Sequence, residues 1–357
     1  MKVCVFGTRG FPRIEGGVEK HCEMLYPLLD ENIEIIIFRR KTYVCSDTVY
    51  KNISFIDLPS TRIKGVEALM HSFLATLHCL VLRPDVVHIH NIGPALFAPI
   101  LKLFSIPVVL TYHSPNYEHK KWGRFAKSLL KFSEQIALKF SDRIIFVNNY
   151  QMQKYPEEVQ KKSVYIPNGI NKPVVSEAMD YLQEIGVESG KYILSVGRIT
   201  PEKGFHDLIR AFCLASTEEY KLVIAGGVEF ESGYMEELRN LSNGLPVIFT
   251  GYVYGDTLAQ LYSNAALFVL ASENEGFPLV LLEAMSYSRN VLVSDIPATH
   301  LVKLPENAYF PVGDTNVLAS KIKEELSNPT EVRFDLSEYN WLYIAQQVSN
   351  ILQKTKE

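Results

Sequence analysis

The chain has 357 residues, enough for about two domains of ordinary size. Its composition, 47% hydrophobic and 21% charged, excludes a disordered or low-complexity protein. The 36 basic and 40 acidic residues give a net charge of −4, which excludes a global positive field for nucleic acid. The five cysteines form no CxxC pair, and neither a signal sequence nor an apolar span of about 20 residues is evident, so we expect a cytoplasmic protein.

Short apolar runs alternate with longer amphipathic stretches along both halves of the chain. Apolar runs without polar alternation indicate strands that are buried on both faces, as in a parallel sheet. The predicted strands are 3–6, 33–38, 86–89, 108–111 and 143–147, then 192–196, 222–225, 247–250, 267–271 and 290–294. Because helical patterns such as 205–212 and 279–285 separate them, we predict βαβ units in two doubly wound α/β domains with a cleft between them.

A Pro-Asn-Gly turn at 167–169 marks the predicted boundary between the halves. We therefore predict an N-terminal Rossmann-like domain over 1–167 and a C-terminal one over 168–335. Residues 336–357 contain an amphipathic helix at 341–353, whose docking site the sequence leaves open.

A glycine-containing loop follows the first predicted strand, at residues 7–19. Its spacing fits neither the dinucleotide-binding GxGxxG pattern nor the P-loop. Gly16 and Gly17 open a predicted helix, whose exposed N–H groups would suit a phosphate; a plain turn that requires glycine is the alternative.

Charged residues occupy two loops of the second half. Arg198 and Lys203 lie in a strand-to-helix loop, where two cations can converge on a diphosphate; the alternative is a solvated loop in which Lys203 pairs with Glu202. Glu275 and Glu283 are eight residues apart, about 12 Å along a helix, which is too far for a glycosidase-like acid/base pair. We expect them to bind different parts of one elongated ligand.

Three histidines stand at the ends of predicted strands. His88 and His90 share one side of a strand, but no third ligand lies near them at metal-binding spacing, so we expect no metal. His113 follows a buried strand and is expected to point into the cleft, as a catalytic, a substrate-binding or a structural histidine.

In this order, the motifs resemble the retaining, nucleotide-sugar-dependent glycosyltransferases of family four, which have the two-lobe GT-B fold. SVGRITPEKG, IAGG, FTGYV, LASENEGFPLVLLEAM and VLVSD are similar to their donor-binding lobe. The first half is similar to the bacterial polysaccharide and O-antigen assembly branch, through GTRG-P-x3-GG-x-E at 7–19, HNIGPALFAPIL at 90–101 and PNGI at 167–170. The resemblance covers roughly residues 1–330.

The resemblance implies a role for each matching position. The residues implied at the reaction centre are His113 and Glu275. Those implied to bind the donor diphosphate are Gly16, Gly17, Arg198 and Lys203. Those implied to bind the nucleoside are Gly251, Tyr252, Val253 and Glu283, and those for the donor sugar are Glu275, Gly276, Phe277, Pro278 and Leu279. Residues 113–117 read HSPNY where the family has HGxDW, which leaves the acceptor contacts near Asn116 open.

The resemblance further implies transfer of a sugar from a UDP-, GDP- or dTDP-sugar to a hydroxyl of a lipid-linked glycan, in surface-polysaccharide synthesis. No Asp-x-Asp sequence occurs, and we expect neither a metal nor another cofactor. The alternatives are a nucleotide-sugar epimerase or phosphorylase of the same two-lobe shape and a non-catalytic nucleotide-sugar sensor. A NAD-dependent oxidoreductase is disfavoured because GxGxxG is missing.

A cationic segment lies between residues 119 and 143. Its helical apolar stripe comprises Trp122, Phe125, Leu129, Phe132, Ile136 and Phe140. Its cations beside the predicted acceptor loop are Lys120, Lys121, Arg124 and Lys127. One interpretation is a surface helix that buries the stripe in the first lobe; the other is a flank that rests on anionic lipid of the inner leaflet.

Overall fold

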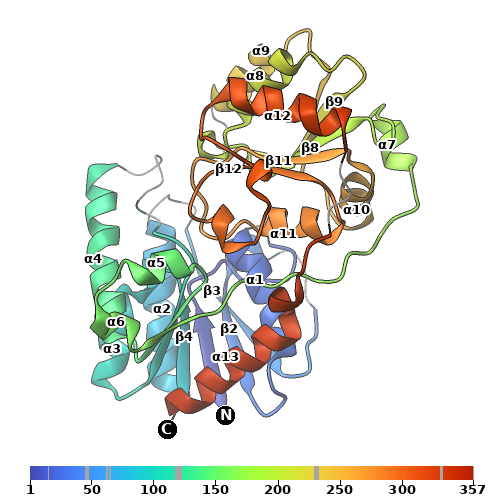
Figure 1. Ribbon diagram of the computed structural model, residues 1–357. Helices are drawn as coiled ribbons and strands as arrows, with labels where there is room; N and C mark the ends of the chain where they lie inside the picture. Colours follow the sequence, from blue (N-terminus) through green and yellow to red (C-terminus); the bar gives the residue numbers. More distant parts are fainter. Residues whose placement is uncertain are drawn as a thin grey trace. The chain divides into compact units, whose positions relative to one another are not determined.

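The structure is a computed structural model that describes residues 1–14, 16–44, 48–61, 63, 66–115, 117, 123–228, 233–329 and 333–356. The chain divides into two compact units (Figure 1). Unit 1 comprises Met1–Gly169 and Glu338–Glu357, and unit 2 comprises Ile170–Ser337. Each unit is built on its own parallel sheet, which confirms the prediction of two Rossmann-like α/β domains.

Unit 1 contains a seven-stranded parallel sheet in the order β3-β2-β1-β4-β5-β6-β7. The strands are β1 (Lys2–Phe6), β2 (Glu34–Arg40), β3 (Ile53–Leu58), β4 (Val86–His90), β5 (Val108–Tyr112), β6 (Arg143–Phe146) and β7 (Ser163–Tyr165). Successive β1 side chains enter different cores, because Cys4 and Phe6 pack on one face and Val3 and Val5 on the other. Burial on both faces explains why these strands appear as continuous apolar runs.

Helices cover both faces of this sheet. The helices of unit 1 are α1 (Gly17–Leu25), α2 (Val66–Leu82), α3 (Ala98–Leu103), α4 (Arg124–Phe140), α5 (Asn149–Gln153), α6 (Glu157–Gln160) and α13 (Trp341–Lys356). α2, α3 and α4 contribute to the core on one face, and α1 and α13 to the core on the other. No helix in the described ranges is both long enough and apolar enough to cross a membrane.

The C-terminal helix α13 belongs to unit 1, which answers the docking question that the sequence left open (Figure 1). Trp341, Ile344, Val348 and Leu352 are buried in the same core as α1. A side chain at Gly169 would bring its Cβ to 2.5 Å from the Trp341 ring, so glycine is required where the chain leaves the first segment of unit 1.

Unit 2 contains a six-stranded parallel sheet in the order β10-β9-β8-β11-β12-β13. The strands are β8 (Tyr192–Val196), β9 (Lys221–Ala225), β10 (Val247–Gly251), β11 (Leu267–Leu270), β12 (Val291–Ser294) and β13 (Tyr309–Phe310). The helices are α7 (Asp180–Glu184), α8 (Phe205–Ala215), α9 (Gly233–Leu241), α10 (Gly255–Asn264), α11 (Leu279–Ser286) and α12 (Thr315–Ser327). Its strands match the predicted ones, apart from the two-residue β13.

Candidate functional site

Most of the residues predicted to bind a donor lie in unit 2, several of them where the strand order reverses. β8 and β11 are neighbours, but the sheet continues to β9 on one side and to β12 on the other. Ligands of open α/β sheets bind at the carboxyl ends of two such strands. The loop after β8 carries Arg198 and Lys203, and the segment after β11 carries Glu275.

Lys203 and Glu275, which were predicted separately, form an ion pair. The Lys203 Nζ lies 2.5 Å from Oε1 of Glu275, and the Ser272 hydroxyl donates to the same oxygen at 2.7 Å. The two charged side chains are only 18% and 11% exposed, so water screens the pair weakly. The partner of Lys203 is therefore distant in the sequence, and Arg198 lies half-buried in the same loop.

Gly204 allows the loop after β8 to approach β11 closely. Its φ is +64°, and a Cβ there would lie 2.0 Å from the carbonyl oxygen of Ala271. The backbone N–H of Glu273 also donates to the carbonyl of Glu202 at 2.9 Å. These two contacts hold the Lys203 segment against the Glu275 segment, so the ion pair rests on backbone packing.

The second carboxylate, Glu283, lies on α11. The buried Tyr262 hydroxyl donates to its Oε2 at 2.9 Å, and burial beside this carboxylate raises the pKa of Tyr262 well above its usual range. The helix begins only at Leu279, with Pro278 at its N-cap. Glu275 precedes the helix, so the estimate of about 12 Å along a helix between the two carboxylates was wrong in its premise.

The remaining predicted donor residues lie around these loops. Gly276 and Leu279 are half-buried, whereas Phe277 and Pro278 are buried. Gly251 has a φ of +69° at the end of β10, and its carbonyl accepts the N–H of Gly226 at 2.9 Å.

Tyr252 follows with 39% of its surface exposed. A Cβ on Gly227 would lie 2.5 Å from its ring, so this aromatic ring lies on glycine backbone beside half-buried Val253. The ring also lies nearly parallel to that of Tyr254, at 14° with 6.4 Å between centroids, and an exposed aromatic ring can stack with a nucleoside base.

In unit 1, Gly16 and Gly17 differ in their surroundings. Gly16 precedes α1 with a φ of +137°, and its Cβ would lie 2.0 Å from Oε2 of Glu19. The same carboxylate accepts the Arg9 N–H at 3.0 Å, so a carboxylate folds back over the start of the helix. A Cβ on Gly17 would meet no atom within 4 Å. The backbone at Gly17 is therefore open, whereas Gly16 is covered by the Glu19 carboxylate.

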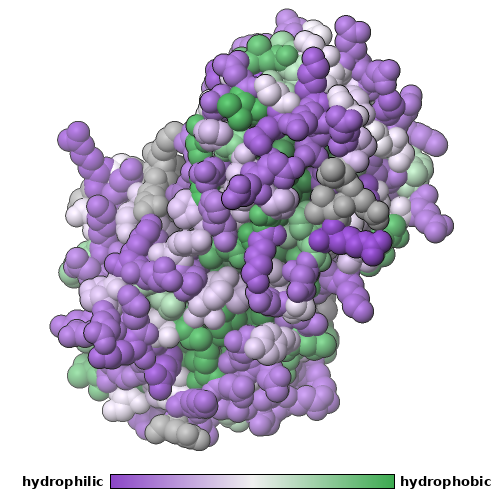
Figure 2. All heavy atoms as spheres, viewed as in Figure 1, coloured by the Kyte–Doolittle hydropathy of each residue, from purple (hydrophilic) through white to green (hydrophobic). Residues whose placement is uncertain are grey.

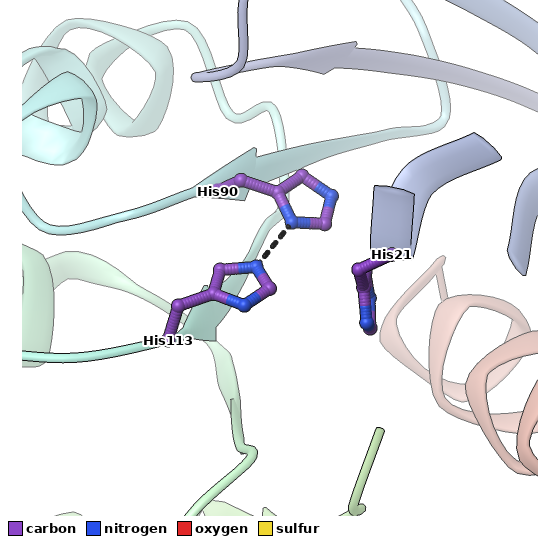
Figure 3. A group of neighbouring side chains, drawn as sticks. All are labelled: His21, His90 and His113. Carbon is purple, nitrogen blue, oxygen red and sulfur yellow. Dashed lines mark hydrogen bonds between the residues drawn. The ribbon is translucent and has the colours of Figure 1, made fainter. Parts of the chain in front are cut away.

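His113 ends a buried chain of hydrogen bonds. The Thr111 hydroxyl lies 2.7 Å from Nε2 of His88, and the Tyr26 hydroxyl lies 2.9 Å from Nδ1 of His88. The same hydroxyl lies 2.7 Å from Nε2 of His90, and Nδ1 of His90 lies 2.9 Å from Nε2 of His113 (Figure 3). Burial lowers the pKa of His88 to about 3 and lowers those of His90 and His113 well below the usual range, so all three rings are neutral at pH 7.

A neutral imidazole has one donor and one acceptor nitrogen, so this chain can run in only two concerted directions. If Thr111 donates to His88, then His88 donates to Tyr26, Tyr26 to His90 and His90 to His113. That direction gives each of the four protons an acceptor and leaves the remaining proton of His113 on Nδ1. The hydrogen bonds thus connect His113, which follows β5, to Thr111 of β5 through residues of η1 (Tyr26–Leu28) and β4.

His21 of α1 stands beside the His90–His113 pair (Figure 3). Its ring is nearly perpendicular to that of His113, at 84° with 4.9 Å between centroids. Nδ1 of His21 lies 2.6 Å from the side-chain oxygen of Asn168, whereas its buried Nε2 has no hydrogen-bond partner. Burial lowers the pKa of His21 to about 4 against the raising effect of Asn168, so at pH 7 this Nε2 presents a lone pair.

Asn116, Lys120, Lys121 and Trp122 lie outside the described residues, as does the side chain of Phe125. Arg124 is exposed and Lys127 half-buried at the start of α4. The first of the two interpretations, in which α4 buries its apolar stripe, is wrong at Phe132, which is 55% exposed. The fully buried face instead contains residues 133, 134, 137 and 138.

Glu134 accounts for this difference. Hydroxyl groups of Tyr112, Tyr117 and Tyr155 donate to its carboxylate, the last at 2.7 Å. A buried carboxylate is stable only when hydrogen bonds replace its water. In Figure 2 the edge where α4 lies is mostly hydrophilic, interrupted by small hydrophobic groups.

Two family models match the chain, one over most of the first segment of unit 1 and the other over most of unit 2. Glycosyltransferase Family 4 matches residues 15–172, and Glycosyl transferases group 1 matches residues 181–341. The chain is a glycosyltransferase with the GT-B fold. An uncharacterized glycosyltransferase of Methanocaldococcus jannaschii is 29% identical over 83% of this chain and 81% of its own length. The O-antigen chain mannosyltransferase of Salmonella typhimurium is 26% identical over 77% of this chain and 71% of its own length.

Solved structures show the same fold for this glycosyltransferase. Sucrose-phosphate synthase from Thermosynechococcus elongatus superposes with a TM-score of 0.83 at 21% identity, covering 99% of this chain and 98% of the other. An Anabaena protein in complex with UDP-glucose superposes with a TM-score of 0.74 at 17% identity, covering 99% and 97%. At these identities the likeness concerns the fold alone.

Sequence reasoning about the glycosyltransferase missed His21, Tyr26 and Asn168. His21 and Tyr26 are five residues apart near α1, and Asn168 lies at the predicted domain boundary. α1 reads GVEKHCEML, so His21 is one of several polar residues there and no local signal distinguishes it. The neighbours of the three missed residues come from β4, β5 and the end of the first segment, and no local spacing connects these elements.

Proposed function

We propose that this glycosyltransferase transfers a sugar from a nucleoside diphosphate sugar to a hydroxyl of a lipid-linked glycan, with retention at the anomeric carbon and without a metal. The observation that carries the donor half is the Lys203–Glu275 pair at the switch point of unit 2. A binding site for UDP-glucose in the similarly folded Anabaena protein supports a nucleotide-sugar donor.

The proposed donor roles follow from charge and position. Arg198 and Lys203 bind the diphosphate, as do the backbone N–H groups at Gly16 and Gly17. Glu283 binds the ribose hydroxyls, and Tyr252 stacks on the base, with the backbone of Gly251 and Val253 at its edge. Glu275 and the backbone at Gly276, Phe277, Pro278 and Leu279 bind the donor sugar. His113 contacts the sugar beside the reacting carbon.

The proposed chemistry requires little from side chains beyond charge stabilisation. When the sugar–phosphate bond breaks, negative charge develops on the leaving phosphate and positive charge on the sugar. Preorganised cations next to that phosphate lower the barrier because they need no reorganisation during the reaction. The incoming hydroxyl attacks from the face that the phosphate leaves, and the phosphate oxygen accepts its proton, so the configuration is retained.

The acceptor half of the proposal rests on α4 and on a relative. The exposed Arg124 and Phe132 present a cation and an aromatic ring on one helix, which suits an anionic lipid surface. The similar Salmonella protein is an O-antigen chain mannosyltransferase, which supports a glycan acceptor in surface-polysaccharide assembly. Asn116 lies in the loop proposed to contact the acceptor.

The decisive experiment supplies UDP-, GDP- and dTDP-sugars to the purified protein, with and without a polyprenyl-diphosphate-linked glycan. Transfer to the acceptor, full activity in EDTA and a retained anomeric configuration by NMR are expected. Lys203→Ala should lower kcat/KM by roughly 10²–10³, whereas Lys191→Ala, an exposed lysine of the same unit, should not. Epimerisation of the donor without acceptor, or a strict Mn²⁺ requirement, would contradict the proposal.

Membrane association is tested separately by co-sedimentation with anionic and neutral liposomes. Changing Lys120, Lys121, Arg124 and Lys127 to Glu should abolish sedimentation with anionic vesicles, since each basic group near such a surface contributes about 1 kcal/mol. Equal sedimentation of the wild type and the variant would leave α4 as an ordinary surface helix.

A further inference from the structure

We propose that His21, His90 and His113 form a binding site for a transition-metal ion of the zinc class, and that this ion opposes sugar transfer by occupying His113. Each of these buried side chains offers one ring nitrogen, and the three nitrogens lie within 4.8 Å of one another (Figure 3). The second clause rests on the proposed function; the binding site itself does not.

The strongest indication is the unpartnered nitrogen of His21. This residue is 3% exposed, and its Nε2 has no hydrogen-bond partner although it is buried. A buried polar atom without a hydrogen-bond partner destabilises the folded protein. The unpartnered nitrogen of His21 therefore points to a bound ligand. Asn168 accepts from Nδ1 of His21 at 2.6 Å and so fixes Nε2 as the lone-pair nitrogen. Metal-bound histidines are typically oriented in this way by an oxygen on the second ring nitrogen.

His90 and His113 complete the set. Their facing nitrogens lie 2.9 Å apart, and nitrogens on a tetrahedral zinc ion lie about 3.3 Å apart. A metal between them takes the place of the proton that they share. In the direction described above, that proton belongs to Nδ1 of His90. Metal binding therefore requires the opposite tautomers, in which His90 donates from Nε2 to Tyr26, Tyr26 donates to His88, and His88 donates to Thr111. His90 and His88 each release the proton of Nδ1 to water and take up one on Nε2, and the two hydroxyl groups rotate. The imidazoles stay neutral, and the net number of bound protons is unchanged.

The kind of ligand atom selects the kind of metal. Three neutral imidazoles suit Zn²⁺, Co²⁺, Ni²⁺ and Cu²⁺, whereas Mg²⁺ and Ca²⁺ prefer oxygen. Three protein nitrogens leave a fourth position for water. The three ring nitrogens lie within 4.8 Å of one another, so binding a single metal ion requires side-chain displacements on the order of 1 Å. This site does not conflict with metal-free sugar transfer, because the metal is proposed to oppose that reaction.

Trp341 provides a direct probe of this site. Its ring centroid is 5.5 Å from that of His21, and it is one of only two tryptophans in the chain. In untagged full-length protein with Trp122→Phe and Cys213→Ser, which removes an exposed thiol, Cu²⁺ should quench the Trp341 fluorescence with 1:1 stoichiometry. Zn²⁺ should displace the quencher and restore the emission, and Mg²⁺ at the same concentration should not.

Two histidine variants separate the site from unspecific binding. His21→Gln should weaken Cu²⁺ and Zn²⁺ binding at least 100-fold. His71→Gln should not, although His71 is equally buried in the same unit and also has unpartnered nitrogens. If His21→Gln does not fold, Asn168→Ala replaces it, with an expected loss of 10- to 100-fold. If His21→Gln and His71→Gln bind Cu²⁺ and Zn²⁺ with equal affinity, or if Mg²⁺ reverses the quenching, the proposed site is wrong.

Activity gives an independent readout. Zn²⁺ should lower the rate of sugar transfer over the same concentrations that displace Cu²⁺, and EDTA should restore it. Full turnover with the site occupied would refute the inhibitory role. If no donor supports transfer while Zn²⁺ still binds through His21, the proposed function fails and the metal site stands.

Discussion

Lys203 and Glu275 should be energetically coupled, although the sequence presents them as separate contacts. Lys203→Met leaves a carboxylate that is 11% exposed and that keeps the hydrogen bond from the Ser272 hydroxyl to Oε1, and Glu275→Gln leaves a shielded ammonium without its carboxylate. Each single change should lower the free energy of unfolding of unit 2 by about 2–3 kcal/mol, because a charge loses its partner away from water. The double variant removes both charges and should cost about as much as one single change. The expected coupling energy is therefore about 2 kcal/mol.

The measurement is a double-mutant cycle by calorimetry, with the Lys191–Glu219 pair as the matched control. That pair has the same 2.5 Å separation in the same unit, but its side chains are 42% and 76% exposed. Water and salt screen it, so its coupling should lie within experimental error. Equal coupling in the two pairs, or additive effects of Lys203→Met and Glu275→Gln, would refute the argument from burial. In kinetics, the same cycle should be non-additive in kcat/KM for the donor.

Gly16→Ala should destabilise unit 1 by more than about 1 kcal/mol, because its Cβ would meet a carboxylate oxygen at 2.0 Å, whereas Gly17→Ala should leave thermal unfolding unchanged and raise the donor KM. Unit 1 should lose stability as the pH falls below 6.5, since the pKa is lowered to about 4 at His21 and to about 3 at His88 and the unfolded chain binds protons first. By pH 5 each of these histidines should cost about 2 kcal/mol, and a flat unfolding profile between pH 8 and 5 would contradict this. Trp341→Ala should cost about 3–5 kcal/mol in chemical unfolding; a loss below 1 kcal/mol would show that α13 is not needed by unit 1.

The strands could be predicted because burial on both faces leaves a local signature. Val3 and Phe6 belong to a run that has no polar alternation, and β1 spans Lys2–Phe6. The buried face of α4 could not be predicted in the same way. An apolar stripe selected Phe132, whereas the helix buries Glu134, whose tyrosine partners come from other elements. A polar residue becomes a core residue when distant partners satisfy it, and the sequence does not show those partners.

The same limit applies to the candidate site. Arg198, Lys203, Glu275 and Glu283 could be named because each stands in a loop or helix of recognisable pattern. The ion pair between Lys203 and Glu275 could not be predicted, because it depends on the packing of Gly204 against Ala271 at the end of β11. The histidine cluster is the extreme case: it joins α1, β4 and the end of β5, and only the sheet order brings these together.

The placement of α13 makes unit 1 a discontinuous domain, with unit 2 inserted between Gly169 and Glu338. During synthesis, unit 2 is therefore complete before unit 1, whose second core still lacks Trp341 and Leu352. Until α13 arrives, that face of the sheet is exposed to chaperones and to other nascent chains. Removal of α13 should therefore disturb the environment of His21, near the start of the chain, and leave the core of unit 2 intact.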